Sequence, residues 1–525
     1  MIKRFIGKIF GMSPKQDLGK RVLIPENKHC IDVNLVDRHA LEVVQALRKA
    51  GYEAYIVGGA VRDLLLGLVP KDFDVATNAT PEEVKTLFRR SFIIGRRFRI
   101  VHVVYGRGRT HEVIEVSTFR ACVDMSAAEL VHGNERTAKA QLVDKKLAMD
   151  ESGRVLRDNV WGTQEQDAAR RDFTINAMYY DPIENIVVDY HHGFKDAKKH
   201  VLRMIGDAAL RYREDPVRIL RVVRFSAKLA RLGFTIDEKT RAPIRECLPL
   251  LKNIPASRMF DEMIKLLQTG HAHASIYALR EQGLQGVFPM LDGLIKDETK
   301  FKLAWLAFAD TDERVAQGKS VAPSFMLACL LWPEVRKRWD SLQAKGEHPV
   351  PALQQSISEV FERRVGDVSG RGKLGADMRE IWLMQPRFEK RTTNAPFSFV
   401  NQPRFRAAFD FMRLRAEAGE YSPEIAHWWE VFSSGDELIR TELIHQAQAE
   451  KKKNKNHQNA KARVQNKTQN KPRNEPQSEL PNEQAAPAKK RRRRRRTSPK
   501  DKHNGSQPVQ QQPSPDKPST EPSVA

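Results

Sequence analysis

Two aspartates separated by a single residue, Asp72 and Asp74, are the side chains of this sequence best suited to bind a metal ion. They lie in residues 72–77, whose alternating pattern predicts a β-strand. Alternate side chains of a strand point to opposite faces, so both acids share one face while Phe73 and Val75 face the core. Two carboxylates on one face suit Mg²⁺, which binds one or two carboxylates together with substrate phosphates. The spacing therefore predicts Mg²⁺-dependent chemistry on a phosphorylated substrate.

A pair of glycines, Gly58 and Gly59, comes shortly before these acids. It separates a strand-like run, residues 55–57, from a helix predicted over residues 60–66. Backbone N–H groups at such a glycine-rich helix start can approach an anion closely. On its own a glycine pair is more often a plain turn, and an Asp-x-Asp pair a solvated strand end. Their combination predicts a phosphate cradle beside a cation site.

This stretch resembles the head-domain signature of the class II template-independent nucleotidyltransferases. These enzymes are relatives of DNA polymerase beta and include CCA-adding enzymes and bacterial poly(A) polymerases. Three runs carry the resemblance, namely Gly58-Gly59, Val61-Arg62-Asp63 and Asp72-Phe73-Asp74. The resemblance implies that Asp72 and Asp74 are catalytic residues that hold Mg²⁺ in a two-metal site, with ATP as the substrate. The nucleotide-binding residues that it implies here are Gly58, Gly59, Arg62 and Asp63.

Two residues compete for the role of a third active-site acid. Glu115 lies in residues 111–119, an alternating strand-like stretch, where the wider polymerase superfamily often places that acid. Asp172 lies in residues 165–180, whose apolar spacing predicts a helix and whose Arg-Arg-Asp-Phe-Thr-Ile-Asn-Ala run resembles the second motif of the family. The resemblance implies that Arg171 contacts the nucleotide and that Asp172 is catalytic, and it leaves Glu115 as the alternative.

A third motif, in residues 211–224, concerns base selection. Glu214, Asp215 and Pro216 are typical of the first turn of a helix. The run resembles the family's Glu-Asp-x-x-Arg motif, in which an acid and an arginine serve as a protein template for the incoming base. For adenine, a carboxylate accepts a hydrogen bond from the N6 amine and a guanidinium donates one to N1. The resemblance implies that Asp215 and Arg218 bind the nucleotide, although enzymes that also accept CTP share this motif.

Three arginines, Arg96, Arg97 and Arg99, lie in the β-rich residues 93–103. Taken alone they indicate a basic surface loop between strands. The segment also resembles the one that marks bacterial poly(A) polymerases among their relatives. This resemblance implies that the three arginines bind RNA, and it favours poly(A) addition over CCA addition.

The composition points to a polyanionic partner. The 525-residue chain carries a formal net charge of +23, and lysines and arginines that neutralise phosphates gain from counterion release. Its four cysteines are far apart and form no Cys-x-x-Cys pair, which predicts neither a zinc site nor a disulfide framework. The charge fits RNA as the partner, and the cysteines fit a protein of the reducing cytoplasm. Residues 1–12 separate apolar from basic side chains at helical spacing, which suggests weak membrane-surface association, with an inert basic terminus as the alternative.

The patterns predict an α+β chain. A nucleotidyltransferase head, with a mixed sheet and flanking helices as in DNA polymerase beta, is followed by all-helical neck and body domains and a disordered basic C-terminal tail. The tail lacks Phe, Trp and Tyr, so it cannot bury enough apolar surface to offset its ordering entropy. Five parts are predicted: an N-terminal basic segment 1–36, the catalytic head 37–198, a neck for base selection and RNA binding 199–270, an RNA-binding body 271–445 and the tail 446–525.

The resemblance implies template-independent addition of AMP from ATP to RNA 3′ ends, with release of pyrophosphate, in mRNA polyadenylation and RNA decay. RNA-decay machinery is then an expected partner. A CCA-adding tRNA nucleotidyltransferase shares nearly every motif and is the main alternative. A non-catalytic RNA-binding adaptor would need only the charge and the helices, and it would not explain acids and arginines at these spacings.

Overall fold

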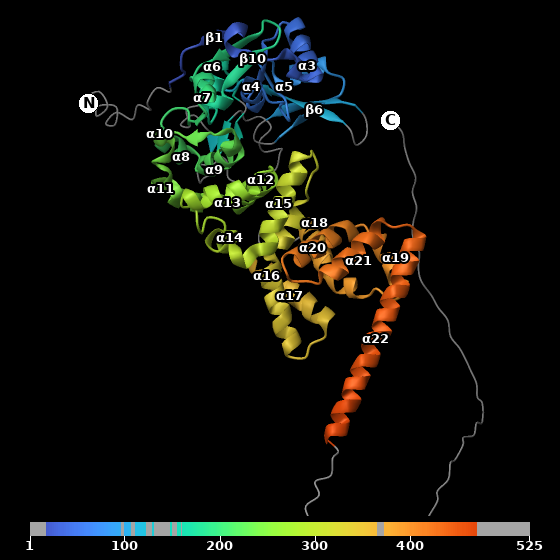
Figure 1. Cartoon of the computed structure of the whole chain (residues 1–525). Coiled ribbons are helices and arrows are strands. Elements are labelled where there is room, and N and C mark those ends of the chain that lie inside the picture. Colours follow the sequence, from blue (N-terminus) through green and yellow to red (C-terminus); the bar gives the residue numbers. More distant parts are fainter. Residues whose placement is uncertain are drawn as a thin grey trace, which may run out of the picture. The chain divides into compact units, whose positions relative to one another are not determined.

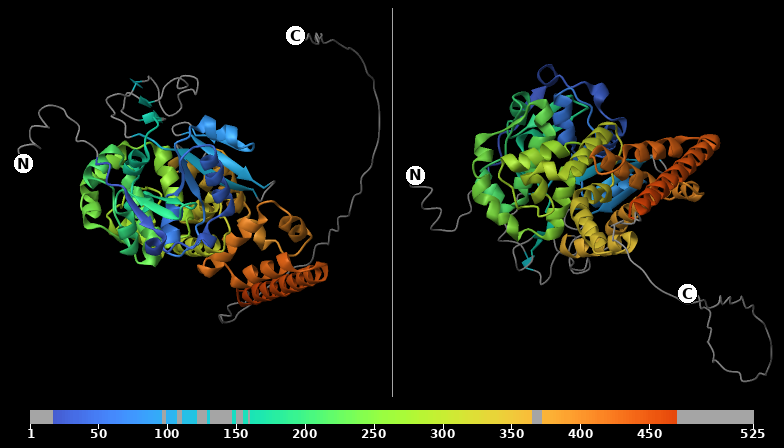
Figure 2. Two further views of the ribbon diagram at one scale, coloured as in Figure 1. Left: turned by 90° about the horizontal axis from the view of Figure 1, so that it is seen from above. Right: turned by 60° about the horizontal axis from the view of Figure 1, so that its bottom comes forward.

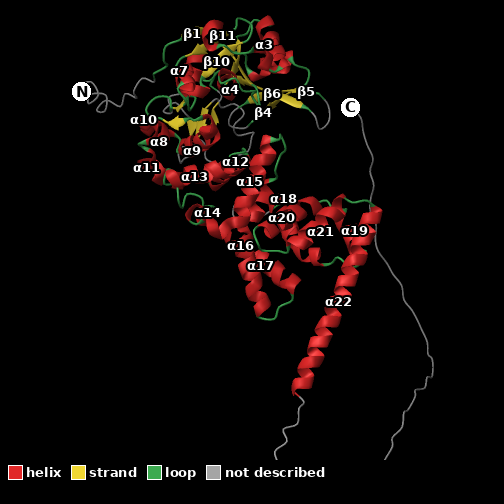
Figure 3. Cartoon of the chain, viewed as in Figure 1, coloured by secondary structure: helices red, strands yellow, loops and turns green. Residues whose placement is uncertain are grey.

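The computed structural model describes residues 17–95, 99–106, 111–121, 129–130, 147–149, 155–158, 160–364 and 372–469. The chain divides into two compact units, Met1–Asn454 and Lys455–Ala525, and the fold described below belongs to the first, except for the end of the last helix, Glu437–Gln469. Strands occupy its N-terminal half and helices the remainder (Figures 1 and 3). This arrangement confirms the predicted α+β class with a mixed-sheet head. Among the described residues, no helix combines the length and the apolar character needed to cross a membrane.

The head is built on an eight-stranded sheet in the order β1-β11-β10-β2-β3-β6-β5-β4. Neighbouring strands in it are antiparallel, except β3 and β6, which are parallel. All four residues of β2 are buried, so both faces of the sheet are covered at that strand. The strands are β1 Val22–Pro25, β2 Ala54–Val57, β3 Asp74–Thr77, β4 Ser91–Ile94, β5 Ile100–Tyr105, β6 Glu112–Thr118, β10 Met178–Asp181 and β11 Ile186–Asp189.

Helices flank this sheet, and their starts follow local sequence signals. α5 begins after Thr80, whose side chain forms a capping box with Glu83. α3 begins after Asp37, whose carboxylate accepts a hydrogen bond from the N–H of Ala40. The head helices are α2 Glu26–His29, α3 Arg38–Lys49, α4 Gly59–Leu65, α5 Pro81–Leu87, α6 Gln164–Arg170 and α7 Gly193–Lys198. A separate small sheet comprises β7 Glu129–Leu130, β8 Leu147–Met149 and β9 Val155–Asp158.

Helices make up most of the chain after the head, as Figure 2 shows from two further directions. One continuous apolar core extends from Ile24 in the head to Leu414, and a second, largely aromatic core surrounds Trp429. The head and the helices that follow it are therefore packed together rather than merely tethered. The longer of these helices are α8 Ala208–Glu214, α9 Val217–Leu229, α12 Ala256–Gln268, α13 Ala272–Glu281, α15 Lys302–Ala316, α16 Pro323–Ala344, α17 Pro349–Arg364, α18 Lys373–Leu383, α20 Phe405–Glu417, α21 Pro423–Ser434 and α22 Glu437–Gln469. Short elements complete the set: β12 Val201–Leu202, β13 Thr235–Ile236, α10 Glu238–Arg241, α11 Ile244–Cys247, α14 Asp292–Lys296 and α19 Ala395–Val400.

The prediction of a helix over residues 165–180 is wrong beyond Arg170, where α6 ends. Met178–Asp181 forms strand β10 instead, because it pairs with β2 on one side and β11 on the other. Phe173, in the connection between α6 and β10, is fully buried. Sheet pairing outweighs the local helical pattern here.

Two predicted domain boundaries differ from what the structure shows. β1 lies inside the predicted N-terminal segment 1–36, yet it pairs with β11 and belongs to the head sheet. α22 continues to Gln469, inside the range predicted to be disordered from residue 446, since its sequence contains neither glycine nor proline to end it. The domain division as a whole stays a prediction, and residues 1–12, with their suggested membrane contact, lie outside the described residues.

Candidate active site

The glycine pair lies between β2 and α4, beside an acid and a cation. Gly58 has a φ of 75°, in the left-handed region that glycine adopts most easily. A Cβ added to Gly58 would lie 3.7 Å from Nη1 of Arg171 and 3.8 Å from Oδ2 of Asp74. Gly59 opens α4, where an added Cβ would lie 3.4 Å from Nη2 of Arg62. The structure thus places the predicted turn next to Asp74 and Arg171.

The paired acids alternate with buried residues as the sequence predicts. Phe73 and Val75 are buried, whereas Asp72 and Asp74 are exposed. β3 begins at Asp74, so Asp72 lies in the connection that leads into the strand. In the parallel pairing of β3 with β6, Asp74 is the direct partner of Glu115. Glu115 therefore lies beside Asp74 on the same face of the sheet.

Glu115 disfavours the charge of Asp74. Although part of its side chain reaches solvent, the surrounding protein desolvates Asp74, and this effect together with the charge of Glu115 raises the pKa of Asp74 to about 6. Arg171 opposes the shift and Asp72 adds to it. A divalent cation needs oxygen ligands and would cancel this repulsion. The donor set of Asp72, Asp74 and Glu115 therefore fits Mg²⁺.

A tighter group of potential ligands lies elsewhere in the head. In the part of the chain that the structure describes, the ligand atoms of Asp37, His39 and Glu112 all lie within 4.8 Å of one another. Nδ1 of His39 is 2.7 Å from Oε2 of Glu112, and this ion pair accounts for their closeness. Asp72, Asp74 and Glu115 are not gathered this tightly, so they would have to draw together around an ion.

His102 extends the row of polar residues to a third strand. It is the direct partner of Glu115 in the antiparallel pairing of β5 with β6. Nε2 of His102 lies 3.1 Å from Oε1 of Glu115, so the imidazole restrains this carboxylate. No local sequence pattern reveals the row of Asp74, Glu115 and His102, because it depends on the register between strands.

Asp172 has a different environment from the other candidate acids. Its Oδ1 accepts a hydrogen bond from Nε of Arg218 at 3.1 Å, and its Oδ2 forms an ion pair with Arg221. Burial disfavours its charge, but Arg221 and Arg218 outweigh this effect and hold the pKa of Asp172 below its ordinary value. No contact of its side chain with Asp72 or Asp74 is found among the described residues. Asp172 therefore links the head to α9 in the neck.

Arg62 is buried behind the glycine turn, with only 1% of its surface exposed. Its Nε and Nη2 donate to Oδ1 of Asp63 at 2.9 and 2.7 Å, and its Nη1 donates to Oδ1 of Asn176 at 2.8 Å. These bonds tie α4 to the 3₁₀ helix Thr174–Asn176. The predicted contact of Arg62 and Asp63 with the nucleotide remains a prediction, and the structure gives both residues protein partners.

Arg171 is held at the turn by the residues around it. Its Nη2 donates to Oδ2 of Asp167 at 3.1 Å, and its Nη1 donates to the carbonyl of Asn176 at 3.3 Å. Its guanidinium also lies 5.3 Å from the centre of the Tyr179 ring. With 23% of its side chain exposed, it is a fixed cation within reach of a ligand at Gly58.

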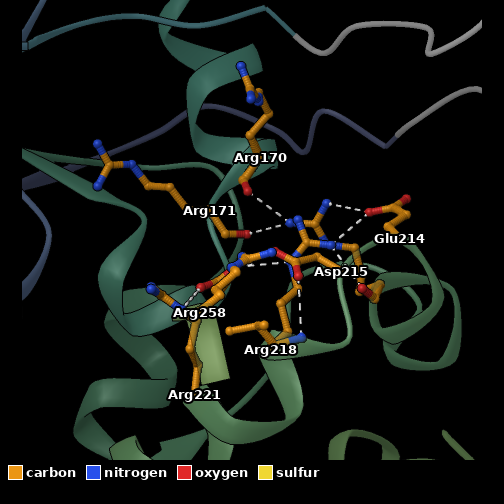
Figure 4. A network of polar contacts seen from close by, with 10 residues as sticks. Arg170, Arg171, Glu214, Asp215, Arg218, Arg221 and Arg258 are labelled. Carbon is orange, nitrogen blue, oxygen red and sulfur yellow. Dashed lines mark hydrogen bonds and ion pairs between the residues drawn. The ribbon is translucent and has the colours of Figure 1, made fainter. Parts of the chain in front are cut away.

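The base-reading candidates form a network at the junction of α8, α9 and α12 (Figure 4). Asp215, between α8 and α9, accepts a hydrogen bond at 2.6 Å from Nη2 of Arg258 on α12. Arg218 donates to Oε2 of Glu214 at 2.9 Å in addition to its bond with Asp172. No sequence pattern predicts a role for Arg258, because only the packing of α12 brings it to Asp215. Both candidates are thus already oriented by protein partners.

The three arginines predicted to bind RNA cannot be compared as a group. Arg96 and Arg97 lie outside the described residues. Arg99 forms an ion pair with Glu82, and 28% of its side chain is exposed. Its role in binding RNA stays a prediction.

Three protein-family models match the chain. Residues 54–203 match the poly A polymerase head domain, and residues 233–294 match the probable RNA and SrmB-binding site of polymerase A. Residues 345–463 match the polymerase A arginine-rich C-terminus. The three matched segments follow one another along the chain in the order head domain, RNA and SrmB-binding site, and arginine-rich C-terminus.

Sequence relatives match most of the chain. Poly(A) polymerase I of Haemophilus influenzae is 43% identical over 420 residues, which cover 78% of this chain and 88% of that protein. Poly(A) polymerase I of Salmonella typhimurium is 38% identical and covers 78% of this chain and 86% of that protein. The CCA-adding enzyme of Geobacillus stearothermophilus is 35% identical, but over only 53% of this chain and 61% of that protein. The solved structure of the Bacillus stearothermophilus CCA-adding enzyme in complex with CTP is 23% identical, with a TM-score of 0.41 over 79% of this chain and 98% of that one.

A glycine turn beside paired acids on a mixed sheet, followed by helical domains, defines a nucleotidyltransferase of the template-independent class. In sequence, the CCA-adding enzyme matches 53% of this chain, whereas the poly(A) polymerase I relatives match 78% of it. The chain belongs to the poly(A) polymerase I family, and it is a polynucleotide adenylyltransferase.

Proposed function

We propose that the head transfers AMP from ATP to the 3′-hydroxyl of RNA and releases pyrophosphate, with Asp72, Asp74 and Glu115 holding Mg²⁺. The observation that carries this proposal is the direct pairing of Asp74 with Glu115 beside the turn at Gly58. In a two-metal site, bound Mg²⁺ makes the primer hydroxyl a better nucleophile and stabilises the leaving pyrophosphate. The chain itself contributes the carboxylates, a backbone without a side chain at Gly58 for close approach of the triphosphate, and the Arg171 cation beside it.

Glu115, rather than Asp172, is proposed as the third acid. Glu115 lies on the strand next to Asp74 and shares its face of the sheet. Asp172 is neutralised by Arg218 and Arg221, which makes it a poor ligand for a further cation. Its proposed role is to fix the orientation of Arg218.

Asp215 and Arg218 are proposed to select adenine. The carboxylate can accept a hydrogen bond from N6, and the guanidinium can donate one to N1. Arg258 and Asp172 hold these two side chains, so the edge presented to the base is set before the nucleotide arrives. Arg62 is proposed to support the turn from behind rather than to touch the triphosphate.

The biological role proposed for this reaction is polyadenylation of mRNA 3′ ends that leads to RNA decay in the cytoplasm. The poly(A) polymerase I relatives support the reaction itself. The basic charge of the chain supports binding to RNA without a requirement for sequence.

Incorporation of each labelled NTP, supplied separately with Mg²⁺, tests the proposal on an unstructured RNA and on a tRNA that lacks its CCA end. Long extension of the unstructured RNA with ATP alone is expected. Short addition of CTP and ATP confined to the tRNA would replace the proposal with CCA addition. Failure to incorporate any nucleotide would favour a non-catalytic RNA-binding adaptor.

A further inference from the structure

Three side chains of α13 and one of α15 form a cluster at the surface beyond the base-reading network. The ring of His273 stacks on Trp305, with centroids 4.3 Å apart and planes 16° from parallel. Tyr277, one turn further along α13, meets Trp305 edge to face at 5.5 Å. The guanidinium of Arg280 lies 5.6 Å from the centre of the Tyr277 ring. We call these four residues the Tyr277 cluster.

The Tyr277 cluster is held in place but remains accessible. Nε2 of His273 is 2.8 Å from the carbonyl oxygen of Trp305, and Nε of Arg280 donates to the carbonyl of Ile295 at 2.8 Å. Tyr277 nevertheless keeps 48% of its surface exposed. A ring already fixed by its neighbours loses little conformational entropy when a ligand stacks on it.

An exposed aromatic ring beside an arginine has the chemistry that recognises unpaired nucleobases. Every base has a flat face that stacks on such a ring, and arginine adds a cation–π contribution. Lys302 lies one turn before Trp305 on α15 and is exposed, and its side chain forms no ion pair or hydrogen bond with any residue that the structure describes. A lysine in that position can neutralise a phosphate next to the stacked base.

We propose that the Tyr277 cluster is a stacking platform for a base of single-stranded RNA. The identity of the RNA as the strand being extended rests on the proposed function. His273, Tyr277 and Arg280 all lie within residues 233–294, which match the family model described as a probable RNA and SrmB-binding site. A protein partner for this surface is the competing possibility, and it is an outcome of the test.

Fluorescence anisotropy of the full chain, without ATP or Mg²⁺, tests the platform with two probes. One is a labelled oligo(A) RNA, and the other has the same length and backbone but lacks bases at internal positions. Tyr277→Ala is expected to weaken oligo(A) binding about tenfold. Its Kd for the abasic RNA should stay at the wild-type value. Tyr277→Phe is the matched control, and since it keeps the ring it should bind both probes like the wild type.

Lys302→Ala separates the phosphate contact from the stacking contact. It should weaken the binding of both probes by the same factor and lower the dependence of binding on salt. Unchanged oligo(A) binding by a Tyr277→Ala variant with a wild-type melting temperature would overturn the proposal and leave the exposed ring to a protein partner. Equal losses of affinity for the two probes in the Tyr277→Ala variant would also overturn the proposal. Because these measurements involve no incorporation, they stand even if the wild type fails to use ATP.

Discussion

Asp74 and Glu115 are direct partners in the parallel pairing of β3 and β6, on the side of the sheet where Gly58 turns into α4. Asp172, the other candidate for the third acid, is paired with Arg218 and Arg221. Two acids of similar intrinsic chemistry therefore have opposite electrostatic surroundings. Glu115 raises the pKa of its neighbour Asp74, and the pair suits a cation. Asp172 is already neutralised by its two arginines.

Glu115→Gln is expected to lower kcat by at least about 100-fold while KM for ATP changes little, because a ligand for Mg²⁺ is lost but the nucleotide contacts remain. Asp72→Asn and Asp74→Asn should abolish turnover and leave RNA binding largely intact. Single-turnover kinetics and RNA anisotropy measure these effects.

Asp172→Asn is the matched control for Glu115→Gln. Removing its charge leaves Arg221 without its acid and Arg218 with Glu214 alone, so the free energy of unfolding should fall by about 2 kcal/mol. Its KM for ATP should rise because Arg218 is released. A folded Asp172→Asn protein with no turnover, next to an active Glu115→Gln protein, would return the third-acid role to Asp172.

Binding of Mg²⁺ should weaken as the pH falls below about 6. The raised pKa of Asp74 means that this carboxyl holds a proton below that pH, and the proton must leave before a cation binds. Where one proton is displaced, the apparent Kd for Mg²⁺ should rise about tenfold for each pH unit. Titration calorimetry in buffers of different ionisation enthalpy would detect the released proton. Identical affinity at pH 5 and pH 7 would contradict this assignment.

Arg62→Met is expected to lower the free energy of unfolding by about 3 kcal/mol, because it leaves Asp63 and Asn176 without their buried donor. Methionine fills a similar volume without the charge, and urea denaturation measures the change. Arg241→Ala, which breaks an exposed ion pair with Glu238, is the control and should change stability little. A stable Arg62→Met protein whose KM for ATP is raised many-fold would instead support direct contact of Arg62 with the triphosphate.

Arg258→Ala should reduce the preference for ATP over CTP. Without its 2.6 Å hydrogen bond from Arg258, the carboxylate of Asp215 keeps only the 3.3 Å bond from the N–H of Val217, and the edge that reads the base is less firmly fixed. We expect about a tenfold fall in the ratio of kcat/KM for ATP to that for CTP, with Arg258→Lys intermediate because it keeps the charge but not the geometry. Competition between labelled ATP and CTP on one RNA gives the ratio directly. An unchanged ratio would separate Arg258 from base selection.

Local features of this fold follow from the sequence alone because neighbouring residues determine them. The capping box of Thr80 and Glu83, the glycine turn before α4, and the alternation of Asp72 and Asp74 with buried Phe73 and Val75 are all interactions within a few residues. The motifs at Gly58, Arg171 and Asp215 also sufficed to indicate the family.

Tertiary structure decided what depends on distant residues. Residues 178–181 form β10 rather than the end of a helix, because β2 and β11 provide partners for both of its edges. The pairing of Glu115 with Asp74 depends on strand register, and a shift of one residue would turn Glu115 to the other face. The approach of Arg258 to Asp215 depends on the packing of α12 in the neck. The sequence by itself therefore determined the chemistry available to this protein, and only the packing of strands and helices decided which acids and arginines meet.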